Sequence, residues 1–170
     1  TCTDSYHNAA PCSGVTWSIT NSGNAKATID GSGNVTPGDL AGTATVIATL
    51  GDKKSASTLL TIAAGPLAVV SVNPSTASVQ AGGSAVMPFA ATCSDSYGNA
   101  VPCTGLAWSL SNSGGAGANI APSTGSVTPG NTAGTATVTA SVGSKSSSAG
   151  LTITPIPLTL ELASNQRELV

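Results

Sequence analysis

The sequence has few aromatic side chains and few charged ones. It contains two Trp, two Tyr and one Phe, and only 7% of its 170 residues are Asp, Glu, Lys or Arg. The formal net charge of −2 provides no positive field that would attract nucleic acid or acidic lipid. We therefore expect no nucleic-acid partner.

Long apolar runs and histidines are also scarce. No stretch reaches the roughly 20 apolar residues of a membrane-spanning helix, and the first residues do not resemble a signal peptide. We expect no membrane insertion. His7 is the single histidine, so a catalytic Ser–His–Asp set cannot occur in both halves of the chain. We expect a protein that is not an enzyme and that carries no cofactor.

The chain contains one segment twice, at an interval of about 91 residues. The motif Cys-x-Asp-Ser-Tyr-x-Asn-Ala-x-Pro-Cys occurs in both halves and is followed in each by a Trp-Ser pair and by Gly-Thr-Ala-Thr-Val. The matching segments are 2–12 with 93–103, 15–19 with 106–110, and 42–46 with 134–138. A period of this length predicts tandem modules, each of them a small domain.

The four cysteines lie in the repeated motif at identical spacing. An even count in matched pairs predicts one disulfide in each copy, Cys2–Cys12 and Cys93–Cys103. Each bond closes a short loop and contributes about 2.7 kcal/mol on the chain-entropy estimate. Disulfides of this kind indicate an extracellular or cell-surface location. The alternative is a metal site, which we do not expect because each copy has only two cysteines and the second has no histidine.

Short apolar runs separated by turn residues predict an all-β chain without helices. In the clearest run, 134–142, Ala and Val alternate with Thr and Ser. Further runs cover 68–72, 84–93, 105–111 and 151–153. Seven or so short strands in a complete copy, with frequent turns, are typical of a β-sandwich.

Two kinds of residue in the repeat have a structural and a functional interpretation. Trp17 and Trp108 lie at the centres of predicted strands, where we expect core tryptophans rather than platforms that stack on sugars. Asp4 and Asp95 lie inside the disulfide loops. We expect each carboxylate to cap its own turn rather than to bind calcium, which needs six or more oxygen ligands.

The order of motifs resembles that of the bacterial immunoglobulin-like (Big) repeats of invasin- and intimin-type surface adhesins. The resemblance is carried by Thr/Ala-Trp-Ser, Gly-x-Val-Thr-Pro-Gly and Ala-Gly-Thr-Ala-Thr-Val. The segments that match are Gly14–Ile19, Gly33–Gly38 and Ala41–Val46, and in the second copy Gly105–Leu110, Gly125–Gly130 and Ala133–Val138. The paired cysteines depart from the family pattern. The resemblance implies two tandem immunoglobulin-like sandwiches that serve as spacers or stalks.

The first copy is incomplete, because it has no counterpart of residues 66–91. We expect an incomplete module at 1–65, which lacks its N-terminal strands, a complete module at 66–154 and a C-terminal tail at 155–170. The missing strands would leave the first core exposed and its strand edges unpaired, and open edges recruit further strands.

The tail contains a candidate donor strand. Residues 157–170 take the place of 66–79, the opening of a further module, and leucines alternate there with polar residues as in a strand. The predicted subunit-contact residues are Leu158, Leu160, Leu162 and Leu169. Simple end-to-end joining falls 12 residues short of two full periods, so a donated tail would need a different register.

These observations predict a structural subunit of an extracellular, pilus-like filament. The tail of one molecule would complete the open module of the next, so that the chain is its own partner in a head-to-tail homopolymer. One alternative is a stalk segment of a longer surface adhesin, completed by neighbouring residues. A second is an accessory carbohydrate-binding module of a secreted enzyme, with glycans as the partner.

Two further features concern the surface. Asn34-Val35-Thr36 is an N-glycosylation sequon in a predicted turn, so Asn34 is a candidate attachment site. Tyr6 and Tyr97 lie at the tips of the disulfide loops, where they could contact a partner or pack on the disulfide.

Overall fold

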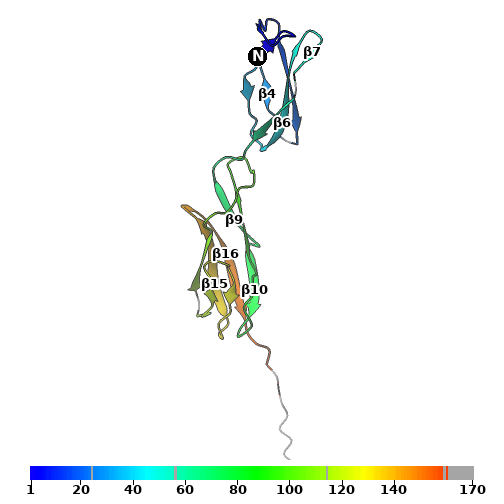
Figure 1. Ribbon diagram of the computed structural model, residues 1–170. Helices are drawn as coiled ribbons and strands as arrows, with labels where there is room; N and C mark the ends of the chain where they lie inside the picture. Colours follow the sequence, from blue (N-terminus) through cyan, green and yellow to red (C-terminus); the bar gives the residue numbers. More distant parts are fainter. Residues whose placement is uncertain (24, 56, 114, 159, 161–170) are drawn as a thin grey trace, which may run out of the picture. The chain divides into compact units, whose positions relative to one another are not determined.

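A computed structural model describes residues 1–160 apart from 24, 56, 114 and 159 (Figure 1). The described residues form sixteen strands and no helix, so the predicted all-β class is confirmed. The chain folds as tandem immunoglobulin-like sandwich modules, of which the first lacks its N-terminal strands.

The chain divides into two compact units. Unit 1 comprises Thr1–Val69 together with Cys93–Pro102, and unit 2 comprises Val70–Thr92 together with Cys103–Val170. The disulfide loop of the second sequence copy is therefore part of unit 1.

Unit 2 contains a four-stranded sheet in the order β10-β16-β15-β12. Its strands are β10 (Thr76–Gln80), β16 (Lys145–Thr154), β15 (Gly134–Val142) and β12 (Ala107–Ser113). Strand β15 pairs antiparallel with both β12 and β16, whereas β10 pairs parallel with β16. The short strands β13 (Asn119–Ile120) and β14 (Val127–Thr128) pair with each other. A separate two-stranded sheet pairs β9 (Val69–Asn73) with β11 (Ala90–Ser94).

The core of unit 2 follows the alternation in the sequence. The buried residues of β15 are Ala136, Val138, Ala140 and Val142, as its period-two pattern predicts. Leu151 and Ile153 of β16 are each 1% exposed, and Trp108 of β12 is 5% exposed.

Unit 1 repeats part of this sheet. Strands β3 (Thr16–Ser22) and β8 (Thr58–Ile62) both pair antiparallel with β6 (Gly42–Leu50), and β7 (Lys53–Lys54) follows β6 in a hairpin. The remaining short strands are β1 (Cys2–Thr3) with β2 (Ala9–Ala10), and β4 (Thr28–Ile29) with β5 (Val35–Thr36). The first copy has no counterpart of β9, β10 and most of β11.

A glycine lies against the tryptophan ring in each copy. Gly33 and Gly125 have φ values of +85° and +74°, in the left-handed region that favours glycine. A Cβ atom on Gly33 would lie 2.6 Å from Cε2 of Trp17, and one on Gly125 would lie 2.8 Å from Cε2 of Trp108. The first Gly of Gly-x-Val-Thr-Pro-Gly is thus required because the turn needs a positive φ and because a side chain would clash with the tryptophan ring.

Replacing Gly125 by Ala should destabilise unit 2 by about 2–4 kcal/mol, because left-handed strain and overpacking against Trp108 add. Gly143 has a φ of +56°, but a Cβ atom there would have no neighbour within 4 Å, so Gly143→Ala should cost only about 1–2 kcal/mol. Both losses of stability can be measured by urea unfolding, followed by Trp108 fluorescence in a Trp17→Phe background. Equal losses from the two variants would contradict the packing argument.

Candidate functional site

Strand β8 leaves one edge of the unit 1 sheet open. In the second copy, the matching strand β16 pairs on one side with β15 and on the other with β10, from Thr76↔Gly150 to Gln80↔Thr154. Among the described residues, β8 pairs only with β6. Its free N–H and C=O groups are positioned to accept another strand.

The core of the first copy is much more exposed than that of the second. Trp17 is 38% exposed and Trp108 only 5%. Leu60 and Ile62 of β8 are half-buried, whereas the matching Leu151 and Ile153 are each 1% exposed. Two similar sequences thus bury their cores to very different extents, and the first module lacks the strands that the second possesses.

In the second copy, the segment that contains Val86 and Phe89 covers part of the core. Val86 donates its N–H to the carbonyl of Val127 and accepts the N–H of Val127, at 2.9 and 2.7 Å. Val127 is completely buried, whereas its counterpart Val35 is half-buried. Phe89, which follows in the same segment, is 5% exposed. The first copy has no residues that correspond to Val86 and Phe89.

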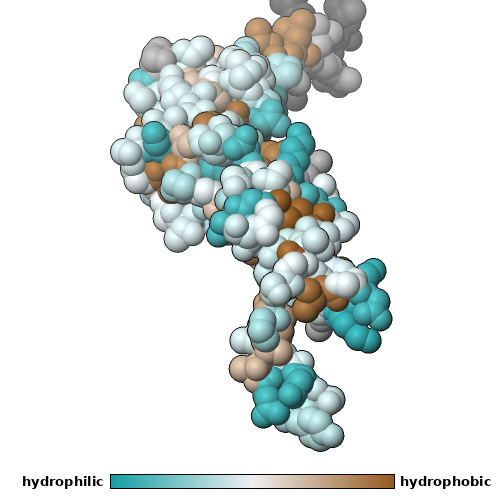
Figure 2. Space-filling view, turned by 90° about the horizontal axis from the view of Figure 1, so that it is seen from above, coloured by the Kyte–Doolittle hydropathy of each residue, from teal (hydrophilic) through white to brown (hydrophobic). Residues whose placement is uncertain are grey.

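Unit 1 also has an open groove of about 730 Å³, which Thr58 alone of β8 lines. Val15, Trp17, Ala48 and Leu50 supply apolar lining, Cys2 and Cys12 also line the groove, and Lys53 and Lys54 with several Ser and Thr residues supply polar lining. Most of the visible surface in Figure 2 is close to neutral in hydropathy, with small apolar patches between polar side chains. The groove thus has a mixed apolar and polar lining.

The described part of the tail is fully accessible. Leu158 is 101% exposed, Leu160 is 94% exposed and Ile156 is 60% exposed. Leu162 and Leu169 lie outside the described residues. The structure thus presents two of the four predicted donor leucines to solvent and does not bring them to the groove.

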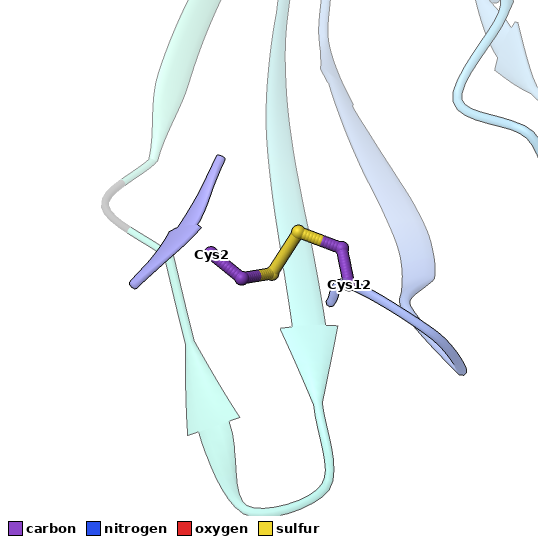
Figure 3. Close-up of a disulfide and its surroundings, with 2 residues drawn as sticks. All are labelled: Cys2 and Cys12. Atoms are coloured by element: carbon purple, nitrogen blue, oxygen red, sulfur yellow. A yellow bond between two sulfur atoms is a disulfide. The ribbon is translucent and has the colours of Figure 1, made fainter. Parts of the chain in front are cut away.

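The structure contains two disulfides. Cys2 and Cys12 are joined with their Cα atoms 5.5 Å apart (Figure 3). Cys93 and Cys103 are also disulfide-bonded, and the described residues include no free cysteine. Each bond closes a loop that holds an Asp, a Tyr and an Asn.

Asp95 caps the turn in the second of these loops and is 2% exposed. Its Oδ1 accepts the N–H groups of Tyr97 and Asn99, both at 2.9 Å. Its Oδ2 accepts the Asn99 side-chain amide and the N–H of Gly65, both at 2.7 Å. The Asn99 amide, followed by these main-chain N–H groups, lowers the pKa of Asp95 from 3.8 to about 2, although burial acts in the opposite direction.

Asn99 extends this contact to the residues just before β6. Its Oδ1 accepts the N–H of Ala41 at 2.8 Å, and its Nδ2 donates to the carbonyl of Asp39 at 2.9 Å. Asn99 is not among the site residues predicted from the sequence. Its presence in both copies of the Cys loop was the available signal, but its partners are main-chain groups that leave no pattern of side chains.

The other predicted surface residues are accessible. Asn34 is exposed, and its side-chain amide donates to Asp30 Oδ2 at 2.8 Å. Tyr6 is 84% exposed and Tyr97 is 59% exposed. No cluster of three or more metal-ligating side chains and no membrane-spanning helix occurs in the part of the chain that the structure describes.

Comparisons with known proteins assign no family. No family model and no curated protein matches the chain. Among solved structures, InvD of Yersinia pseudotuberculosis is 20% identical, with a TM-score of 0.49 over 96% of this chain and 53% of that one.

Domains 4 and 5 of the S-layer protein SbsC are 23% identical, with a TM-score of 0.41 over 89% of this chain and 78% of that one. Drosophila N-cadherin EC1-4 is 20% identical, with a TM-score of 0.41 over 84% and 41%. These values do not assign a function.

The stability of the chain should depend on pH through Asp95. Because folding lowers its pKa, its contribution is present above about pH 3.8 and is lost as the pH falls towards 2. Asp95→Asn should therefore lower stability near pH 6 and flatten the acid side of the profile, as measured by urea unfolding at about pH 6 and 2.5. Asp30, whose pKa is also lowered but which is exposed, is the control, and Asp30→Asn should have a smaller effect. A loss near pH 6 no larger than that of the control would contradict this role.

Proposed function

We propose that this chain is a structural subunit of an extracellular filament that assembles by donor-strand complementation. The C-terminal tail of one molecule adds a strand along the free edge of β8 in the next. Leucine side chains of the tail cover the half-buried Leu60 and Ile62 of β8. Each added molecule presents a new open module, so the contact propagates head to tail.

The observation that carries the proposal is the difference between the two copies. The same strand positions are buried in the second copy and half-buried in the first, and the first also has an unpaired edge among the described residues. An added strand would supply main-chain hydrogen bonds and apolar cover together.

The register of the tail distinguishes donation from simple continuation of the repeat. In the repeat register, Glu161 and Leu160 take the places of Val70 and Val69 of β9, which are 5% and 45% exposed, and β9 pairs with β11 rather than with β16, the counterpart of β8. Leucines in that register would face outwards. A shift of one residue moves them all to the inner face, and this is the register we propose for the donor strand.

The covalent and surface chemistry fits an extracellular setting. Disulfides persist in oxidising compartments, and two of them staple a chain that has few large core side chains. The second candidate is a stalk segment of a longer surface protein, which the hydrogen bonds from Asp95 and Asn99 to the main chain of the first copy favour. The two candidates differ in which residues complete the first module.

Removing residues 157–170 should abolish filaments, because it removes the donor while leaving every described strand intact. Electron microscopy and sedimentation of the full chain and the truncated chain measure this directly. Replacing Leu158, Leu160 and Leu162 together by Ser should have the same effect, since the proposed register buries them.

The matched control changes the other face of the same strand. Thr159→Ser combined with Glu161→Ser should leave assembly intact, because these positions point to solvent in the proposed register. Filaments that survive truncation, or a full chain that stays monomeric at all concentrations, would exclude strand donation and favour the stalk.

A further inference from the structure

The turn at Asp4–Asn8 repeats the one at Asp95–Asn99 but has no outside partner among the described residues. Asp4 Oδ1 accepts the N–H groups of Tyr6 and Asn8 at 2.8 and 3.0 Å, and Oδ2 accepts the Asn8 side-chain amide at 3.1 Å. These bonds match those inside the Asp95 turn. Asp4 and Asn8 are both exposed, whereas Asp95 is buried and Asn99 half-buried.

The Asp95 turn is buried because it binds three main-chain groups that the Asp4 turn does not bind. The Asp95 turn binds the N–H of Gly65, the N–H of Ala41 and the carbonyl of Asp39. All three belong to the closing end of the first copy, where β6 begins and β8 has ended. The closing end of the first copy is thus bound by the Asp95 turn, whereas the Asp4 turn of the first copy binds no such end among the described residues.

The second copy has the same three groups at its closing end. The repeat places Ile156 where the first copy has Gly65, Ala133 where it has Ala41, and Asn131 where it has Asp39. The N–H groups of Ile156 and Ala133 and the carbonyl of Asn131 have no hydrogen-bond partner among the described residues, and all three residues are exposed.

These groups lie at one place in unit 2. A Cβ atom built on Gly82 would lie 3.4 Å from Asn131 Oδ1 and 3.8 Å from Ile156 Cδ1. The surrounding backbone is fixed, because Gly82 donates its N–H to Gly130 and Ala81 donates its N–H to Thr154, both at 2.9 Å. The closing end therefore presents a preformed surface.

We propose that the Asp4–Asn8 turn is a docking site for the closing end of unit 2 in another molecule of this chain. Asp4 Oδ2 accepts the N–H of Ile156, Asn8 Oδ1 accepts the N–H of Ala133, and Asn8 Nδ2 donates to the carbonyl of Asn131. The contact uses loop ends rather than a strand edge, and it is argued from the repeat rather than from a donated tail.

The shape of the turn alone does not carry this inference. Asp30 and Asn34 form the same turn, with bonds of 2.9, 2.8 and 2.8 Å, and it is equally exposed. Its counterpart at 122–126 has no Asp and no docked partner to compare with among the described residues. Asp4 differs from Asp30 because the turn that matches it in the repeat is already bound to the matching surface.

One side chain at the new contact differs. A Cβ atom on Gly65 would lie 3.3 Å from Asp95 Oδ2, closer than ordinary contact, and Ile156 carries such an atom. The Asp4 carboxylate must therefore shift by a few tenths of an ångström on docking. Ile156→Gly should consequently tighten the contact.

Two full chains joined in tandem through a copy of residues 80–91, which restores the 91-residue period, test the proposal. Residue-resolved hydrogen exchange is measured at Ala133 and Ile156 of the leading chain and compared with the single chain. We expect exchange at both amides to slow about tenfold, the effect of one net hydrogen bond each. The pKa of Asp4 in the following chain, from its carboxyl NMR signal, should fall towards that of Asp95.

Three variants distinguish docking from general stabilisation. Asp4→Ala in the following chain should restore fast exchange, and Asp30→Ala, which removes the twin turn, should not. Ile156→Pro in the leading chain removes one donor without touching the turn, and the Asp4 pKa should then return to its single-chain value. Unchanged exchange in the tandem protein, or equal effects of Asp4→Ala and Asp30→Ala, would overturn the docking site. Strand donation is judged separately, from filaments of the single chain.

Discussion

Each copy of the module is built around one tryptophan, and the cover over that ring is the constraint on which the rest depends. On one side each ring lies against a glycine, Gly33 or Gly125, because a side chain there would clash with the ring. A small module with few large residues has a modest core, so it cannot leave such a ring in water without loss of stability. Trp108 is buried in a complete module, whereas Trp17 remains 38% exposed in an incomplete one. The open edge of β8 and the groove both occur in the copy whose tryptophan is exposed.

Much of the fold was predictable from the sequence. The alternation over 134–142 predicted the buried face of β15, and the repeat predicted tandem modules, in which β3 pairs with β6 as β12 pairs with β15. Regular turn residues and period-two patterns are local signals, so single-sequence reasoning can use them. The contacts of Asn99 were not predictable, because its partners are main-chain atoms far away in the sequence.

The two proposed contacts use different parts of the chain. Strand donation involves the β8 edge and apolar side chains, whereas the Asp4 turn involves three polar main-chain groups. Apolar cover supplies most of the free energy of such an interface, and directional hydrogen bonds fix its orientation and register. Together they would join successive molecules at both the side and the end of a module.

The parallel pairing of β10 with β16 has a mechanical consequence. These are early and late strands of one module, and in a parallel pair the chain enters at one end of the ladder and leaves at the other. Tension applied along the chain therefore shears all the rungs from Thr76 to Gln80 at once, instead of unzipping them singly. A module with this connectivity should therefore resist a pulling force better than one whose terminal strands pair antiparallel.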